Sequence, residues 1–160
     1  MTMIKVGMAD LNVCKSPDAL TTLGLGSCIG IILYDQRTKV SGLAHIMLPD
    51  STQIKKNENK AKFADTAIIE LIKAMEKMGA SKLRLVSKIA GGAQMFSFSG
   101  NNDMMRIGER NAEATRKILH ELNIPILSED CGKNYGRTIE FYAETGELHI
   151  KTIGKEIKII

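Results

Sequence analysis

Residues 28–48 read Cys28-Ile29-Gly30-Ile31-Ile32-Leu33-Tyr34, Asp35-Gln36-Arg37-Thr38-Lys39 and Val40-Ser41-Gly42-Leu43-Ala44-His45-Ile46-Met47-Leu48. The first and last of these segments are apolar runs that contain β-branched residues, a composition typical of well-buried strands. The middle segment is polar and turn-like, and Pro49 stops the second run. Two apolar runs joined by a short polar link predict a β-hairpin.

The expected register of this hairpin brings a thiol close to an imidazole. With the turn centred between Gln36 and Arg37, Cys28 pairs with His45. Directly opposite residues on antiparallel strands share one face and have Cβ atoms about 4.5–5.5 Å apart. A shift of one residue would place the two side chains on opposite faces. In this register Cys28 and His45 fit a thiol nucleophile and its base.

Two glycines precede the cysteine, in the segment Thr22-Leu23-Gly24-Leu25-Gly26-Ser27. Glycine lets a substrate approach the backbone closely and leaves amide groups free, so we expect Gly26 and Ser27 to support an oxyanion site. The donors would be amides such as those of Ser27 and Cys28. An inert role stays open, because free cysteine is among the most buried residue types and a histidine on an apolar strand is commonly a core residue.

The remaining pattern predicts an α+β domain with two helices packed on sheets. The length of 160 residues fits one domain, residues 1–160. The helix at 106–122 is expected to bury Ile107, Ala114, Ile118 and Leu122. Further strands are expected at 4–13, 19–25, 82–89, 124–127, 137–143 and 148–153, a polar loop at 49–59, and another helix at 60–78 that ends before Gly79.

Composition narrows the class of protein. The net charge of +4 is mild, aromatic residues make up only 4%, and tryptophan is absent, so a nucleic-acid role is unsupported. No signal-peptide pattern or membrane-length apolar run is present, so we expect a cytoplasmic protein without membrane insertion. Cys14, Cys28 and Cys131 lack metal-type spacing and are expected to be thiols in a reducing compartment.

These residues also resemble a known family, CheD, the chemoreceptor glutamine deamidases of chemotaxis. The resemblance covers nearly the whole chain. It is carried by Thr22-Leu23-Gly24-Leu25-Gly26-Ser27-Cys28, by Gly42-Leu43-Ala44-His45-Ile46-Met47-Leu48-Pro49-Asp50-Ser51, and by residues 62–67, 88–96, 107–111, 130–132 and 136–137. It implies a Cys-His-Thr triad in which Cys28 is the nucleophile, His45 the base and Thr22 the residue that orients the imidazole. Spacing alone would make Thr22 an ordinary strand residue.

The resemblance also implies a fold, a reaction and partners. The fold would be a β-sandwich of mixed sheets flanked by helices in α/β/β/α-type layers, similar to the deamidase domain of cytotoxic necrotizing factor toxins. The reaction would convert glutamines of methyl-accepting chemoreceptors to glutamate through a thioester, with no metal or organic cofactor. Because a receptor glutamine must reach Cys28, we expect the site to be open at the surface.

Two other functions stay open beside the deamidase. The chain could be a binding module that regulates receptors and a CheC-type phosphatase by association. Phe96 and Phe98, in an apparent loop, are the candidate contact with that phosphatase. A general cysteine hydrolase such as a peptidase is disfavoured, because the short chain has no second lobe to form a substrate cleft.

Overall fold

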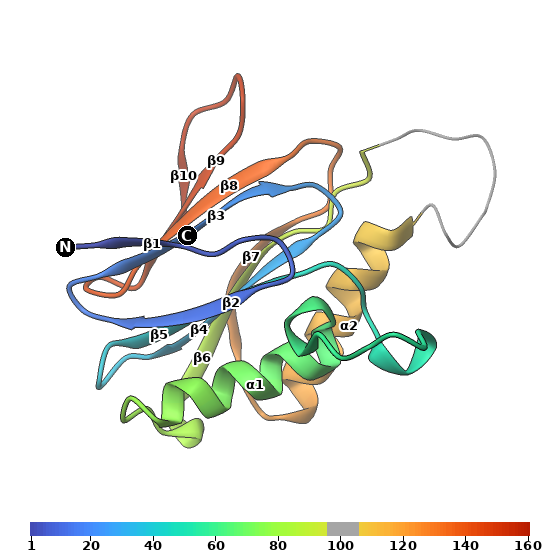
Figure 1. The fold of residues 1–160 in the computed structure, drawn as a ribbon. Coiled ribbons are helices and arrows are strands. Elements are labelled where there is room, and N and C mark those ends of the chain that lie inside the picture. The colour runs from blue at the N-terminus through green and yellow to red at the C-terminus, as the bar shows by residue number, and fades with distance from the viewer. Residues whose placement is uncertain (96–105) are drawn as a thin grey trace.

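The computed structural model describes residues 1–95 and 106–160, whose strands form two mixed sheets (Figure 1). Sheet A has the strand order β1-β3-β8-β9-β10, and sheet B has the order β2-β5-β4-β6-β7. The strands of sheet A are β1 (Met3–Lys5), β3 (Ala19–Leu25), β8 (Arg137–Tyr142), β9 (Glu147–Lys151) and β10 (Lys158–Ile159). Those of sheet B are β2 (Leu11–Lys15), β4 (Ile29–Asp35), β5 (Val40–Ile46), β6 (Leu85–Gly91) and β7 (Ile126–Cys131).

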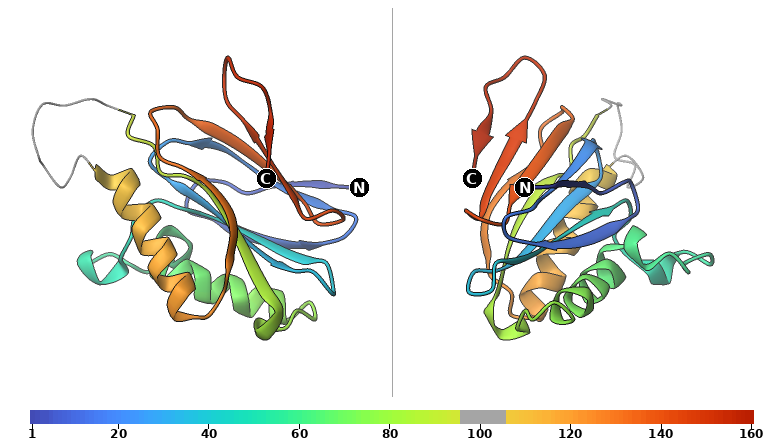
Figure 2. Two further views of the ribbon diagram at one scale, coloured as in Figure 1. Left: turned by 180° about the vertical axis from the view of Figure 1, so that it is seen from behind. Right: turned by 60° about the vertical axis from the view of Figure 1, so that its left-hand side comes forward.

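Two α-helices, α1 (Ala64–Glu76) and α2 (Ile107–Glu121), lie together on the outer face of sheet B (Figures 1 and 2). Short 3-10 helices occur at η1 (Ser51–Gln53), η2 (Lys60–Lys62) and η3 (Lys82–Arg84). No helix within the described ranges has both the length and the apolar character to cross a membrane. The α+β class is therefore confirmed.

The order of the layers differs from the expected α/β/β/α arrangement. It is sheet A, sheet B and then helices, and no described helix covers the outer face of sheet A (Figure 2). That outer face is polar and carries the ion pair of Lys151 with Glu140 and the contact between the Tyr142 and His149 rings. The outer face of sheet B is apolar and packs against the helices through residues such as Ile29 and Ile31. Only sheet B therefore needs a helical cover.

The predicted hairpin is present, and its register is the main correction. β4 and β5 are antiparallel and every residue in both is buried. His45 pairs with Gly30, so the predicted pairing of His45 with Cys28 is wrong by two residues. Asp35 still belongs to the ladder opposite Val40, which moves the turn toward residues 36–39. A shift of two residues keeps the same face, so Cys28 and His45 both face sheet A.

Other boundaries also differ from the sequence prediction, and the strand expected at 124–127 runs over Ile126–Cys131 as β7. The expected strand at 4–13 is two strands, β1 and β2, which belong to different sheets. The helix expected at 60–78 begins at Ala64, because residues 60–62 form η2. The strand expected at 82–89 begins with η3 and continues to Gly91. The hairpin expected near the C-terminus is confirmed as β8 and β9.

A buried carboxylate fastens the end of β4. Asp35 is fully buried and accepts hydrogen bonds from the amides of Arg37 and Ser81 and from the guanidinium of Arg84. Burial alone would raise the pKa of this carboxyl, but these hydrogen bonds, above all the one from Arg84, hold it well below its usual range. The carboxylate thus ties the hairpin turn to the segment that leads into β6.

Replacing Asp35 with asparagine should destabilise the fold. Asp35→Asn removes the charge and turns an NH₂ group toward N–H donors, and we expect a loss of about 2–3 kcal/mol in the free energy of unfolding in urea at pH 7. Because the folded pKa of Asp35 is lowered, its contribution is present above the unfolded pKa of about 4 and is lost as the pH falls through the folded value. The pH dependence below pH 4 should therefore flatten in the variant.

Asp10→Asn is the matched control, since Asp10 is exposed and, among the described residues, its carboxylate accepts one hydrogen bond, from the amide of Leu11. This variant should change stability by less than about 0.5 kcal/mol. An Asp35→Asn protein as stable as the control would show that the buried carboxylate does not hold the turn.

Candidate active site

Three predicted site residues face the space between the two sheets. Thr22 lies on β3 of sheet A, His45 lies on β5 of sheet B, and Cys28 immediately precedes β4. Thr22 and His45 are completely buried, and Cys28 is 7% exposed. Cys28 packs in the apolar cluster between the sheets, which also contains Leu25 and Ile139. The structure thus brings residues from both sheets to one interior region.

A hydrogen bond across the sandwich fixes the imidazole of His45. Its Nδ1 atom lies 2.7 Å from Oγ1 of Thr22, and the same Oγ1 lies 2.7 Å from the carbonyl oxygen of Val6. A carbonyl oxygen only accepts, so the single hydroxyl proton of Thr22 is donated to Val6. The Thr22 oxygen must then accept from Nδ1–H of His45, which leaves Nε2 without a proton. Thr22 therefore selects the tautomer that can act as a base at Nε2.

The basic nitrogen and the thiol are both neutral in this arrangement. Nε2 of His45 is buried and has no hydrogen-bond partner among the described residues. Burial lowers the pKa of His45 and raises the pKa of the Cys28 thiol, the second effect being opposed in part by the amide of Cys28 itself. Within the described residues no hydrogen bond joins Cys28 to His45. The site thus resembles a resting thiol and base more than a preformed ion pair.

Backbone contacts hold the loop that carries Cys28. The carbonyl of Gly26 accepts from the amide of Ala93, and the carbonyl of Cys28 accepts from the amide of Gly92, each at 2.9 Å. In the described part of the chain, the amides of Ser27 and Cys28 donate to no backbone carbonyl. Amides left free beside a thiol are the donors that an oxyanion site requires.

Close backbone contact beside this loop depends on glycine. A Cβ atom at Gly91 would lie 2.2 Å from the carbonyl oxygen of Cys28, and φ at Gly91 is +117°. Both facts exclude a larger residue, because neither the space nor the backbone angle suits an L side chain. The end of β6 can therefore approach the nucleophile loop only as glycine.

Asn111 of α2 is a buried polar residue that was not among the predicted site residues. Its Nδ2 atom donates to the carbonyls of Ser27 and Met47, each at 3.0 Å. The predicted inner stripe of this helix is correct only in part, because Ala114, Ile118 and Leu122 pack against the core but are half-buried. The buried residues are Gly108, Asn111, Ala112, Thr115 and Leu119. A polar pair at i and i+4 beside small residues, here Asn111 and Thr115, was the signal that could have identified this face.

The site is less accessible than expected. Cys28 is nearly buried and His45 is wholly so, which makes the expectation of an open surface site wrong for this structure. Met95 lies beside the loop that carries Cys28, since a Cβ atom at Gly26 would be only 3.2 Å from Cγ of Met95. Phe96 and Phe98, the candidate partner contacts, lie outside the described residues.

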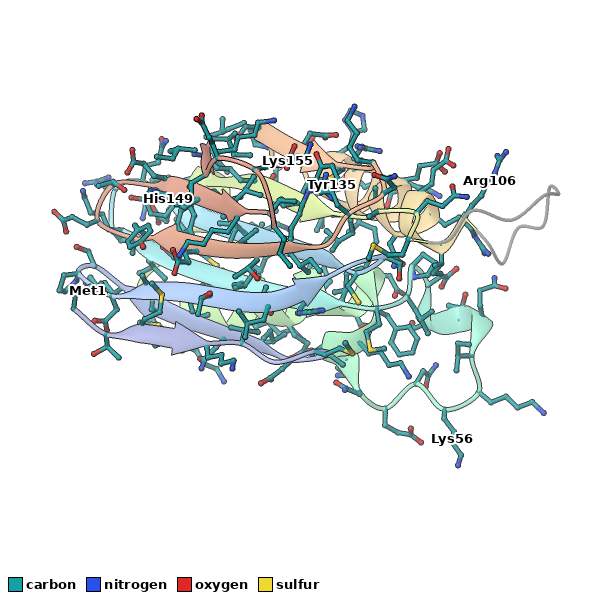
Figure 3. All side chains as sticks on the ribbon, turned by 90° about the horizontal axis from the view of Figure 1, so that it is seen from above. Met1, Lys56, Arg106, Tyr135, His149 and Lys155 are labelled. Carbon is teal, nitrogen blue, oxygen red and sulfur yellow. The ribbon has the colours of Figure 1, made fainter. Side chains whose placement is uncertain are left out.

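An ion pair closes the sandwich near the same end of β6. The guanidinium of Arg137 is buried, donates to Asp130 of sheet B at 3.0 Å and reaches the carbonyl of Gly132. Arg137 and Lys155 also lie over the ring of Tyr135, and the last two are labelled in Figure 3. Asp130 binds Lys158 as well. This cluster joins β7 of sheet B to β8 and β10 of sheet A.

The other two cysteines are free thiols, Cys14 buried and Cys131 half-buried. Burial raises the pKa of both Cys14 and Cys131 to about 11, so neither is a thiolate at neutral pH. Among the described residues, no group of three or more histidine, cysteine, aspartate or glutamate side chains is placed to hold a metal ion. Cys14 also faces the space between the sheets, but it pairs with Ser41 on β5, four residues from His45. Cys28 lies two residues from Gly30, the residue that pairs with His45.

Comparisons with known proteins agree on one family. The model of the family described as "CheD chemotactic sensory transduction" matches residues 47–152. A protein of Lachnoclostridium phytofermentans named "Probable chemoreceptor glutamine deamidase CheD" is 66% identical over 99% of this chain and 98% of its own length. A protein of Halalkalibacterium halodurans named "Chemoreceptor glutamine deamidase CheD" is 59% identical over 94% of each chain.

Nitrogen-15 NMR of the imidazoles tests the tautomer of His45. We expect a neutral ring with the proton on Nδ1, and a midpoint of protonation below the ordinary histidine value of about 6.5, because burial disfavours the charged form. His45→Gln identifies the signal by its loss. Thr22→Val should abolish the preference for Nδ1–H. An Nε2–H tautomer in the unmodified protein would contradict the proposed orientation.

Proposed function

This chain belongs to the CheD family, and on that premise we propose that it is a chemoreceptor glutamine deamidase with the triad Cys28, His45 and Thr22. The observation that carries the triad is the hydrogen bond from His45 to Thr22, which leaves Nε2 unprotonated and unpartnered on the face that Cys28 shares. The relatives' names supply the reaction and the substrate. The geometry supports the assignment of the base.

In the proposed first step, Nε2 of His45 takes the thiol proton while Sγ of Cys28 attacks the amide carbon of a substrate glutamine. A C–S bond forms, and the carbonyl π electrons move to oxygen to give a tetrahedral oxyanion. Because both groups are neutral at rest, proton transfer accompanies attack and no stable ion pair precedes it. Substrate binding must bring the two groups into contact, as catalytic hydrogen bonds commonly tighten only in the complex.

In the second step the oxyanion collapses, the C–N bond breaks, and His45 returns its proton to the leaving ammonia. The thioester is then hydrolysed by a water molecule that gives its proton to Nε2, which yields glutamate and restores the thiol. Thr22 accepts the Nδ1–H bond throughout and stabilises the imidazolium that forms twice per cycle. The free amides of Ser27 and Cys28, in the loop that begins at Gly26, would hold both oxyanions.

The proposed substrate is the cytoplasmic domain of a methyl-accepting chemoreceptor, which places the reaction in the cytoplasm. We propose residues 1–160 as one deamidase domain. Near burial of Cys28 favours a second role, because a closed site suits a protein whose access is governed by association. A CheC-type phosphatase is the proposed partner for that binding role, with Phe96 and Phe98 as the proposed contact.

Conversion of glutamine to glutamate tests the deamidase directly. Receptor cytoplasmic fragments incubated with the unmodified protein should gain glutamate at specific glutamines, as read by peptide mass spectrometry. Cys28→Ala should abolish the conversion, and His45→Gln should lower kcat by at least about 10³-fold, because each removes a group used in both steps. Cys14→Ala is the control and should keep activity. Receptor binding without conversion by the unmodified protein would favour the binding module.

Loss of the Thr22 hydroxyl should weaken the base without removing it. Thr22→Val keeps the shape of the side chain, and we expect kcat to fall about 10- to 100-fold with little change in KM, because the imidazole loses its preferred tautomer. Thr22→Ser should recover most of the rate. Equal activity of the valine variant and the unmodified protein would remove Thr22 from the triad.

A further inference from the structure

Asn111 connects α2 to the two segments that carry the proposed nucleophile and base. Its side chain is completely buried. One NH₂ group donates to the carbonyl of Ser27, directly before Cys28, and to the carbonyl of Met47, two residues after His45. Both partners are carbonyl oxygens and can only accept, so the nitrogen of the amide must face them. A single side chain thus fixes the loop of one proposed catalytic residue against the strand of the other.

The contact with Ser27 also fixes the direction of an amide. The carbonyl of Ser27 and the N–H of Cys28 belong to one planar trans peptide, in which they point in opposite directions. Holding the carbonyl toward α2 therefore turns the N–H of Cys28 away from α2. A hydrogen bond accepted by the carbonyl also polarises the peptide and strengthens its N–H as a donor.

From this arrangement we propose that Asn111 is a positioning residue, which orients the Cys28 amide toward the oxyanion that forms when Sγ attacks the substrate. The inference rests on the deamidase proposed above and adds a residue that acts on it through the backbone. Among the described residues, the side chain of Asn111 donates hydrogen bonds to the carbonyls of Ser27 and Met47 and forms none with Cys28 Sγ or the imidazole of His45.

A second observation separates Asn111 from an ordinary core residue. Its Oδ1 atom is buried and has no hydrogen-bond partner among the described residues. A buried acceptor without a donor is unfavourable, and an apolar residue of the same shape would avoid it. The position is therefore better suited to directing two carbonyls than to stabilising the helix. Thr115, one turn later on the same buried face, instead donates to the carbonyl of Asn111 within the helix at 2.8 Å.

The test compares two reactions of the same thiol. Deamidation passes through an oxyanion, whereas alkylation by iodoacetamide is a direct displacement with no oxyanion at a carbonyl. Asn111→Leu keeps the size of the side chain and removes both donors. We expect its kcat for a receptor fragment to fall about 10²-fold, with KM and the rate constant for alkylation of Cys28 each within about threefold of the unmodified protein. Peptide mass spectrometry separates alkylation of Cys28 from that of Cys14 and Cys131.

Thr115→Val is the matched control, because it removes a buried hydrogen bond from the same helix face without touching Ser27 or Met47. Its kcat should stay within about threefold of the unmodified value. Thermal melting checks the fold of each variant. If Asn111→Leu does not fold, Asn111→Ser takes its place, and we expect the same result: a lower kcat with an unchanged rate of alkylation of Cys28. An unchanged kcat in a folded Asn111 variant, or alkylation that falls in parallel with kcat, would overturn the positioning role. Absence of conversion by the unmodified protein would instead overturn the deamidase itself.

Discussion

A hydrogen bond between two sheets, from Nδ1 of His45 to Oγ1 of Thr22, is the constraint around which the interior of this protein is arranged. Both side chains are completely buried, and a buried polar group is stable only when it is paired. The pairing needs β3 of sheet A to lie opposite β5 of sheet B at one fixed separation. It also needs the carbonyl of Val6, just after β1, to take the hydroxyl proton. The polar contact thereby fixes the positions of β1, β3 and β5 relative to one another.

The same burial determines the chemistry available at rest. An interior that excludes water disfavours both a thiolate at Cys28 and an imidazolium at His45, as the directions of their pKa shifts show. A neutral pair is unreactive toward most electrophiles, so the thiol depends on a bound substrate and on fixed backbone donors. The glycine at position 91 allows the neighbouring strand to come close enough to hold the nucleophile loop without a side chain between them. The close packing that holds the nucleophile loop in place is therefore also what keeps the thiol and the imidazole neutral at rest.

Part of this arrangement could be predicted from the sequence, because it follows from the alternation of residues along a strand and from the apolar composition of the strands. The hairpin of β4 and β5 follows from two apolar runs, and the shared face of Cys28 and His45 follows from the period of two. The exact register could not be obtained, since it depends on the Asp35 contacts with Arg84 and with a segment far along the chain. Asn111 was missed because apolar periodicity cannot identify a polar residue that is buried by tertiary contacts. The resemblance to a family supplied Thr22, which no local pattern marks.

The pairing of β3 with β8 has a consequence for how the protein is made. Thr22 is opposite Ile139, and β3 is held between β1 and β8. A ribosome therefore delivers Thr22, Cys28 and His45 well before it delivers β8, the strand that pairs with β3. Until β8 emerges, the emerging chain has no formed sheet A to hold the imidazole in its basic tautomer. The orientation of the proposed base is thus acquired only after residues 137–142 have been synthesised, and the hairpin of β4 and β5 alone does not supply it.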